Sequence, residues 1–370
     1  MTSGELTYRL AAMGDVMLAR EVGRHFKERP EDFSFNDIKS VLNGHDLICL
    51  NLENPVGING TPDKVQDPHV TFCSHPDTLK ALKNLGTHVV SIGNNHMLDY
   101  GEAALVETLE YLNAAGIKYA GAGRNYEDAN RPLLLECNGK KIAFLSHVFI
   151  YSASTLRAKR NRPGVSDHRI RNILPRIKEL SREGYHVIVS IHWGWEYSFY
   201  PIPYQMKQAR QMIDNGALLI LGHGPHYPQG IEDYKDGQIV YSLGNFIFDE
   251  PQKYAKRSFI YSVGVTEDRR LERSEVFPVH INNHVPKLVE GKEKEHIERL
   301  IYNLGKVYYK KDRRFWKKIN NGYFRDIVGR IIRVKSLKFA FLPPISFYLN
   351  VGFKNLINKM NPANMKSVLR

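Results

Sequence analysis

The sequence predicts an α/β protein in which two stacked, mixed β-sheets are flanked by helices. Two observations support this fold class. Over the first 225 residues, apolar and partly β-branched runs alternate with helical patterns, as they do in layered α/β domains. After residue 225 the helical patterns stop, and segments with a two-residue hydrophobic period are joined by short polar turns. The second pattern is typical of antiparallel strands.

The apolar runs of the first part predict strands, and the segments between them predict helices. The strands are expected at 6–13, 46–52, 87–92, 117–121, 142–147, 186–192 and 217–222. The helices are expected at 75–85, 102–115, 168–183 and 204–215. The first helix follows the cap-like Ser74, and each of the others ends just before a glycine, as helices often do. Antiparallel strands are expected in the later segments 227–234, 239–248, 259–268 and 269–281.

The composition is that of an ordinary folded protein. Of the 370 residues 42% are apolar and 25% are charged, which excludes a disordered chain. The three cysteines, Cys49, Cys73 and Cys137, are widely spaced and favour reduced thiols over a disulfide framework or a zinc site. No signal-like segment opens the chain, and no unbroken apolar stretch has transmembrane length. We therefore expect a cytoplasmic protein.

The net charge of +13 is concentrated in the last eighty residues. Residues 291–370 contain 19 basic and 5 acidic residues, whereas residues 1–290 contain 33 basic and 34 acidic ones. This contrast predicts a body over 1–286 and a basic, aromatic-rich helical extension over 287–370. The extension could be a solvated helical face docked on the body, or it could bind a polyanion or a membrane. An apolar patch at 339–353 favours peripheral contact with an anionic inner membrane surface.

Polar side chains follow five of the predicted strands, at the edge where open α/β sheets bind ligands. In chain order they are Asp15, then Asn51, Glu53 and Asn54, then Asn94, Asn95 and His96, then His192 and Glu196, and finally His223 and His226. Taken singly, several have an ordinary explanation. A Gly-Asp pair is common in turns, an asparagine-rich turn explains 94–95, and a lone histidine after a strand is usually a hydrogen-bonded core residue.

Together these residues favour a metal centre, because strand ends of one sheet meet at one edge. His223 and His226 flank a Gly-Pro turn just after a buried strand, and neither imidazole gains from burial without a partner. Imidazole, carboxylate and amide groups suit zinc, manganese or iron better than calcium. The candidate ligands for one or two divalent ions are Asp15, Glu53, Asn95, His192, His223 and His226. Such a centre predicts metal-assisted hydrolysis.

In their order along the chain, the motifs resemble those of the CapA family of bacterial capsule synthesis proteins. The matching segments are GDVML at 14–18, NLEN at 51–54, NNHMLDYG at 94–101, HWGWE at 192–196, GHGPH at 222–226 and SLGNFIFD at 242–249. The resemblance covers about residues 7–285. It implies a calcineurin-like metallophosphoesterase fold, which is an αββα sandwich. It also implies a role in making or processing a capsular or exopolysaccharide polymer or poly-γ-glutamate.

The resemblance further implies roles for single residues. The ligand set that it implies is the one given above, with carboxylates from Asp15 and Glu53, an amide from Asn95 and imidazoles from His192, His223 and His226. The catalytic residues would be His96, which meets a charged substrate oxygen, and Asp99, which orients His96. Two features depart from the wider superfamily. Met17 stands where a histidine ligand is usual, and two residues rather than one separate the closing pair of histidines.

Four further residues are candidates for substrate contact: Asn54, Trp193, Glu196 and Asn245. Trp193 opens an aromatic loop, 193–200, which could face a sugar or polymer or could cover an edge of the core. The expected partner of the protein is an anionic polymer or its precursor.

Two other functions compete with a hydrolase of this kind. A non-catalytic scaffold of a polymer-synthesis complex would keep the fold without turnover, because Met17 replaces a ligand. A nucleic-acid phosphodiesterase would use the basic extension, but nucleic acid is the least favoured partner since the chain contains no recognised binding motif.

Overall fold

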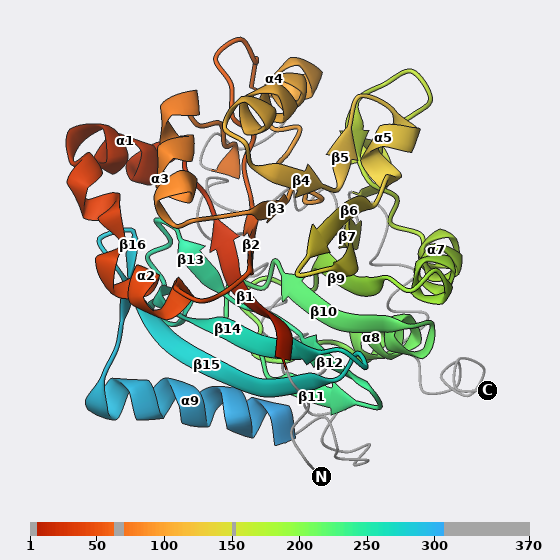
Figure 1. The fold of residues 1–370 in the computed structure, drawn as a ribbon. Coiled ribbons are helices and arrows are strands. Elements are labelled where there is room, and N and C mark those ends of the chain that lie inside the picture. Colours follow the sequence, from red (N-terminus) through yellow and green to blue (C-terminus); the bar gives the residue numbers. More distant parts are fainter. Residues whose placement is uncertain (1–5, 63–69, 150–152, 307–370) are drawn as a thin grey trace, which may run out of the picture. The chain divides into compact units, whose positions relative to one another are not determined.

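The fold is described here from a computed structural model, which defines residues 6–62, 70–149 and 153–306 (Figure 1). Residues 1–62 and 72–310 form one compact unit. The second unit consists of 63–71 and 311–370, of which only Val70 and Thr71 are among the described residues. Two large β-sheets and one small sheet make up the strands of the described chain.

The larger sheet is eight-stranded and mixed. Its strands are β1 (Leu6–Val16), β2 (Leu47–Leu52), β3 (Val89–Ser91), β4 (Lys118–Ala120), β13 (Asn245–Ile247), β14 (Arg257–Thr266), β15 (Leu271–Asn282) and β16 (Val285–Leu288). They follow the order β16-β15-β14-β1-β2-β3-β4, and β13 pairs with β1 near the end of that strand. Strands β1 to β4 are parallel, whereas β14, β15 and β16 are antiparallel to their neighbours.

The second large sheet is six-stranded and also mixed. Its strands are β6 (Leu133–Cys137), β7 (Lys140–Phe149), β9 (His186–Trp193), β10 (Ala217–His223), β11 (Ile231–Tyr234) and β12 (Gly237–Val240), in the order β11-β12-β10-β9-β7-β6. Every residue of β9 and β10 is buried, as expected for parallel strands that are covered on both faces. A small sheet pairs β5 (Ala122–Gly123) with β8 (Gly164–Val165).

The described helices pack on both large sheets and on the small sheet. They are α1 (Arg20–Glu28), α2 (Asn36–Leu42), α3 (Leu79–Asn84), α4 (Gly101–Ala114), α5 (Tyr126–Asn130), α6 (Ala153–Leu156), α7 (Ile170–Arg182), α8 (Pro203–Asp214) and α9 (Gly291–Lys306), with the 3₁₀ turns η1 (Pro30–Ser34), η3 (Pro76–Thr78) and η4 (Lys253–Lys256). Helices α1 to α4 share one core cluster with the larger sheet. Helices α7 and α8 pack on β9 and β10 of the other sheet.

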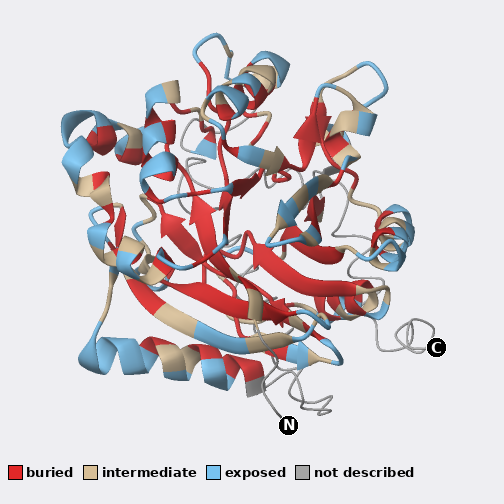
Figure 2. Ribbon diagram, viewed as in Figure 1, coloured by how far each residue is buried: buried red, intermediate tan, exposed pale blue. Residues whose placement is uncertain are grey.

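A second apolar core lies between the two sheets, and Figure 2 shows the central strands as buried. It joins Leu10 and Cys49 of the larger sheet to Phe144, Ile188 and Leu219 of the smaller one. The layers are therefore helix, sheet, sheet and helix, which confirms the predicted fold of two stacked mixed sheets flanked by helices. All seven strands and all four helices expected in the first part are present, with ends shifted by a few residues.

After residue 225 the antiparallel pairing of β11 with β12 and of β14 with β15 confirms the prediction, but one segment differs from it. The segment 239–248 was expected to form antiparallel strand, but it divides into β12, which is parallel to β10, and β13, which is parallel to β1. The division occurs at Gly244, whose φ of 74° interrupts the extended backbone. Its carbonyl oxygen would lie 2.0 Å from a Cβ at Gly14, so only glycine at position 14 allows the two strands to approach. This crossing brings Asn245 beside the end of β1.

Helix α9 packs on β11 and β15 through Ile297, Ile301 and Leu304, which are buried. The compact unit therefore runs past the expected body boundary at residue 286. Most of the predicted extension, 307–370, lies outside the described residues, and so does its apolar patch at 339–353. In the part of the chain that the structure describes, no helix has both the length and the apolar character to span a bilayer.

Candidate metal centre

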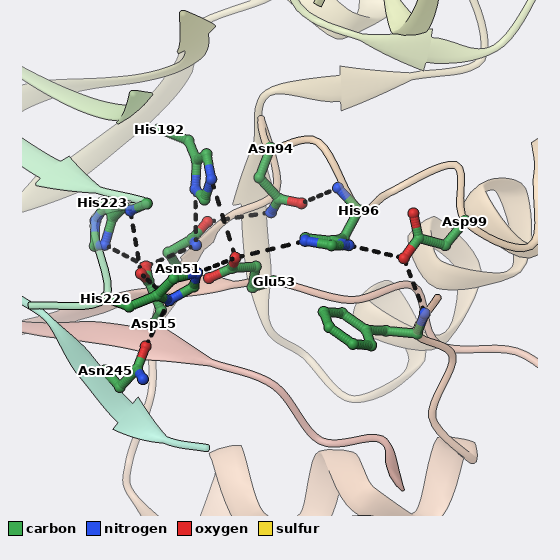
Figure 3. A network of polar contacts seen from close by, with 12 residues as sticks. Asp15, Asn51, Glu53, Asn94, His96, Asp99, His192, His223, His226 and Asn245 are labelled. Carbon is green, nitrogen blue, oxygen red and sulfur yellow. Dashed lines mark hydrogen bonds and ion pairs between the residues drawn. The ribbon is translucent and has the colours of Figure 1, made fainter. Parts of the chain in front are cut away.

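Because of the strand register, polar side chains lie next to one another at the carboxyl ends of neighbouring strands in each large sheet. In the larger sheet Asp15 is aligned with Asn51 of β2 on one side and with Asn245 of β13 on the other. In the smaller sheet His223 of β10 is aligned with His192 of β9. The close-up in Figure 3 shows these side chains converging, together with Glu53, His96 and His226.

Asp15 is completely buried and accepts several hydrogen bonds. Its Oδ1 accepts from Asn51 Nδ2 at 2.9 Å and from His223 Nδ1 at 3.0 Å. Its Oδ2 accepts from the Gly224 backbone N–H at 3.1 Å. Burial alone would raise the pKa of Asp15, but the hydrogen bond from His223 and the charges of the neighbouring imidazoles lower it below its ordinary value. Asp15 is therefore an ionised carboxylate within a ring of donors.

The environment of Glu53, unlike that of Asp15, disfavours the ionised carboxylate. It follows β2 directly, and its backbone N–H donates to the carbonyl oxygen of Val16 at 2.8 Å, which brings the side chain next to Asp15. The residue is 1% exposed, yet neither carboxylate oxygen has a hydrogen-bond partner among the described residues. Burial, and then the charge of Asp15, raise the pKa of Glu53 well above its ordinary value. A buried carboxylate is costly unless a hydrogen bond, a cation or a bound metal compensates its charge.

Imidazole nitrogens surround Glu53. Its Oε1 lies 3.7 Å from His226 Nε2, 3.8 Å from His96 Nε2 and 4.0 Å from His192 Nε2. Asp15, Glu53 and His192 each offer a ligand atom, and these three atoms lie within 4.8 Å of one another. Burial lowers the pKa of His192 to about 3, so its imidazole is neutral near pH 7. The neutral form is the one that binds metal.

The side chains of the two asparagines in the loop after β3 have different roles. The side chain of Asn94 anchors the loop, because its Nδ2 donates to the Leu52 carbonyl oxygen at 2.8 Å and its Oδ1 accepts from the His96 backbone N–H at 3.1 Å. The Oδ1 of Asn95 is buried without a hydrogen-bond partner in the described chain. Asn95 therefore has the amide oxygen that is available to a ligand.

His96 is held by a carboxylate behind it. Its Nδ1 donates to Asp99 Oδ2 at 2.8 Å, and Asp99 is 1% exposed. This contact turns Nε2 toward Glu53 (Figure 3). The arrangement is the one expected for a carboxylate that orients an imidazole.

The turn after β10 places His226 on the other side of the centre. His226 has a left-handed backbone, with φ of 60°, and follows Gly224 with φ of 102°. A Cβ at Gly224 would lie 2.9 Å from His192 Nε2, so the turn packs closely against that imidazole. The Nδ1 of His226 lies 2.8 Å from Asn245 Oδ1. Asn245, a candidate for substrate contact, is completely buried and instead orients His226.

Two other candidates for substrate contact also lie elsewhere than expected. Asn54 is completely buried, and its Oδ1 accepts from the Leu18 backbone N–H at 2.6 Å while its Nδ2 donates to Ser74 Oγ at 2.9 Å. Trp193 is completely buried and donates from its indole N–H to the Tyr241 carbonyl oxygen at 3.0 Å. Side chains of a strand alternate between its faces, so Trp193 points away from the side on which His192 lies.

Of the remaining candidates, Glu196 is exposed, and its charge contributes to the raised pKa of Glu53. Met17 is completely buried, and its sulfur accepts from the Ala19 backbone N–H at 3.1 Å, so it belongs to the core. The sequence motifs did include Asn51, but they did not show that it would bond Asp15. Phe72, which contacts His96, was missed because it stands in an irregular segment with no motif.

The residues of the site fit a divalent metal ion. Four buried polar atoms that lack a hydrogen-bond partner in the described residues belong to side chains of this network (Figure 3): both Glu53 oxygens, Asp99 Oδ1 and Asn245 Nδ2. A fifth, Asn95 Oδ1, belongs to the loop that carries His96. Native proteins rarely leave such atoms unpaired unless a ligand or water completes them. Two buried carboxylates, an amide oxygen and three imidazoles are also the donor types that bind zinc, manganese or iron.

Comparisons with known proteins identify the family of the chain. The sequence model of the family described as "Bacterial capsule synthesis protein PGA_cap" matches residues 9–250. The "Capsule biosynthesis protein CapA" of Bacillus anthracis is 30% identical over 321 residues, which cover 84% of this chain and 78% of that protein. The "PGA biosynthesis protein CapA" of Bacillus subtilis is 31% identical over 275 residues, which cover 74% of this chain and 72% of that protein.

Among solved structures, the NAD nucleotidase of Haemophilus influenzae aligns with a TM-score of 0.43 and 11% identity. That alignment covers 86% of this chain, which spans 60% of the nucleotidase chain.

Proposed function

Since this chain belongs to the PGA_cap family of bacterial capsule synthesis proteins, we propose that it is a metal-dependent hydrolase that processes an anionic capsule polymer or its precursor. The observation that carries the proposal is the buried carboxylate of Glu53, which has no hydrogen-bond partner among the described residues and lies beside the ionised Asp15 and three imidazoles. The names of the relatives, which refer to capsule and PGA biosynthesis, support a polymer as the substrate.

The proposed ligands are Asp15, Glu53, Asn95, His192, His223 and His226, and they suffice for one or two ions of manganese, zinc or iron. A divalent ion in such a site polarises a phosphoryl or acyl oxygen and makes a bound water more acidic. Asn51 and Asn245 hold Asp15 and His226 in place through their amide groups. Side chains that are already held in position lose less conformational freedom when a metal ion binds.

His96 is the proposed proton-transferring residue. Its Nδ1 is bound to Asp99, so Nε2 is the nitrogen that faces the centre and can give a proton to, or take one from, the reacting oxygen. Asp99 also stabilises the positive charge that develops on the imidazole when Nε2 holds the proton.

The test is a panel of substrates of stated chemistry. Phosphomonoesters, phosphodiesters and γ-glutamyl peptides are incubated with the protein and added Mn²⁺, and the released product is measured. We expect turnover of at least one class, loss of turnover in Asp15→Asn, and wild-type turnover in Asp236→Asn, which changes an exposed aspartate in the β11–β12 turn. Absence of metal-dependent turnover on every class would contradict the hydrolase.

A non-catalytic scaffold is the second candidate, and Met17 is the observation that favours it. Its side chain lies in the core and supplies no ligand, so one position of a two-metal site has fewer donors. If the protein is a scaffold, it should be folded, with or without bound metal, and should turn over no substrate of the same panel. An oligonucleotide added to the panel tests the phosphodiesterase alternative, which predicts activity that falls steeply with salt.

The proposed contact with an anionic membrane surface depends on residues 291–370, of which only α9 is among the described residues. Sedimentation with vesicles of anionic and of neutral lipid tests it. Binding to the anionic vesicles alone, lost at high salt, is the expected result.

A further inference from the structure

The ring of Phe72 lies against the imidazole of His96 in a tilted arrangement. The two rings have centroids 4.3 Å apart and planes inclined by 30°. Phe72 is 4% exposed, so its ring is fixed in the interior rather than moving at the surface. A flat aromatic surface against an imidazole restricts rotation of that imidazole about its Cβ–Cγ bond.

The backbone of the same residue acts on His96 a second time. The Phe72 N–H donates to Asp99 Oδ2 at 2.8 Å, and this oxygen also accepts from His96 Nδ1 at 2.8 Å. Phe72 therefore restrains His96 from its face and, through Asp99, from its edge. Both restraints keep Nε2 directed at the centre, 3.8 Å from Glu53 Oε1.

Arg20 in turn fixes the ring of Phe72. Its guanidinium carbon lies 4.6 Å from the centroid of that ring, which is a cation–π contact. Arg20 has a left-handed backbone with φ of 49°, a conformation that arginine seldom adopts. Its guanidinium forms an ion pair with Asp249, including a bond from Nε to Oδ2 of 3.1 Å.

The segment that supplies Asp249 also touches the metal side of the site. Phe248 lies edge-on to Phe72, with centroids 6.4 Å apart, and edge-on to His226, with centroids 5.2 Å apart. Asn245 of the same segment bonds His226. One short segment thus sets the position of a candidate metal ligand relative to the ring that restrains His96.

We propose that Phe72, clamped by the Arg20–Asp249 ion pair, is a positioning residue that fixes the orientation of the His96 imidazole. The consequence for turnover rests on the proposed hydrolase function, whereas the orientation of the ring does not. Phe72 contacts His96, Phe248, Arg20 and Asp99, none of which is a candidate metal ligand. Its loss is therefore expected to affect proton transfer and leave metal binding intact. A displacement of about 1 Å in a reacting group costs up to about a hundredfold in rate.

The test compares Phe72→Leu, which keeps apolar volume but removes the flat face, with Phe72→Tyr, which restores that face. Protein labelled with ¹⁵N-histidine is studied by long-range ¹H–¹⁵N correlation at one near-neutral pH, and the His96 signals are assigned by their loss in His96→Gln. We expect a single Nδ1-protonated pattern for His96 in the wild type and in Phe72→Tyr. In Phe72→Leu the pattern should be averaged or shifted. Phe26→Leu, which removes a similarly buried ring that packs on Phe33 outside the site, is the matched control.

The kinetic arm uses the substrate that the wild type hydrolyses in the panel above. Phe72→Leu should lower kcat about tenfold or more with a nearly unchanged KM, and elemental analysis should find wild-type metal content. Thermal unfolding checks that the variant is folded, and recovery in Phe72→Tyr excludes a general packing defect. Wild-type His96 signals and kcat in Phe72→Leu would overturn the proposal. A wild type that hydrolyses no probe would overturn the hydrolase, while the spectra would still decide the role of Phe72.

Discussion

Replacement of Glu53 by glutamine should have opposite effects on the metal-free and the metal-bound protein. The carboxylate is buried beside Asp15, and neither of its oxygens has a hydrogen-bond partner in the described chain. Its raised pKa expresses the same unfavourable environment. Glutamine keeps the shape and removes the charge. Without metal, the free energy of unfolding of Glu53→Gln should therefore be higher than that of the wild type.

The magnitude follows from the cost of an unsatisfied buried group, which is about 1–3 kcal/mol and more when the group is charged. We expect Glu53→Gln to gain about 1–3 kcal/mol in the presence of a chelator. Metal reverses the order, because an ion at a hundred times its Kd stabilises the wild type by about 2.7 kcal/mol. The variant, which lacks this ligand, should gain far less from the same metal concentration.

Urea unfolding followed by circular dichroism, once with EDTA and once with Mn²⁺, measures both effects. The control is Glu183→Gln, which changes an exposed glutamate at the end of α7 and should shift stability by no more than about 0.5 kcal/mol in either condition. A Glu53→Gln variant that is less stable than the wild type in EDTA, or one that is stabilised by Mn²⁺ as strongly as the wild type, would refute the reasoning.

Two further predictions concern the frame of the site. Gly14→Ala should cost about 2–5 kcal/mol in urea unfolding, because its Cβ would lie 2.0 Å from the Gly244 carbonyl oxygen and would disturb the backbone bonds between β1 and β13. Gly116→Ala places its methyl in open space with φ of 73° and should cost only about 1–2 kcal/mol, so equal losses in the two variants would contradict the account. Burial lowers the pKa of His147 from 6.5 to about 4. The unfolded state therefore binds the proton more readily than the folded state. For this residue the free energy of unfolding of the metal-free protein should fall by about 1.4 kcal/mol per pH unit as the pH drops from 6.5 to about 4. His147→Asn keeps a donor for the Asp167 carbonyl oxygen, to which His147 Nδ1 now bonds at 3.0 Å, and it should flatten that decline. If His147→Asn loses as much unfolding free energy between neutral and mildly acidic pH as the wild type does, this prediction is wrong.

The sequence was most informative where a local pattern decides the structure. The largely apolar runs of β9 and β10 predict buried strands, and the polar residues at their ends predict the edge at which His192 and His223 lie. The helices α1 and α2 were not predicted, because neither begins with a side-chain cap and polar residues dominate the first of them. The crossing of β13 to the larger sheet depends on contact between Gly14 and Gly244, which are 230 positions apart.

The same distinction applies to the candidate site. Five candidates lie at or just after the ends of strands and could be found from the sequence, and the structure brings them together: Asp15, Glu53, His192, His223 and His226. The roles of Asn245, Trp193 and Phe72 depend on which way a side chain points in the folded protein. Residue order alone does not contain that information, since the alternation along β9 had to be known before Trp193 could be assigned to the core.

The most direct test of the metal centre is the metal content of the purified protein. The wild type, the double variant His223→Ala/His226→Ala and the control His75→Ala/His296→Ala, which changes two exposed histidines, are loaded with Mn²⁺ or Zn²⁺, desalted and analysed for metal. We predict at least one ion per chain in the wild type and the control, and less than about a tenth of that amount in His223→Ala/His226→Ala. If the double variant retains as much metal as the wild type, the six residues do not form the metal centre described here.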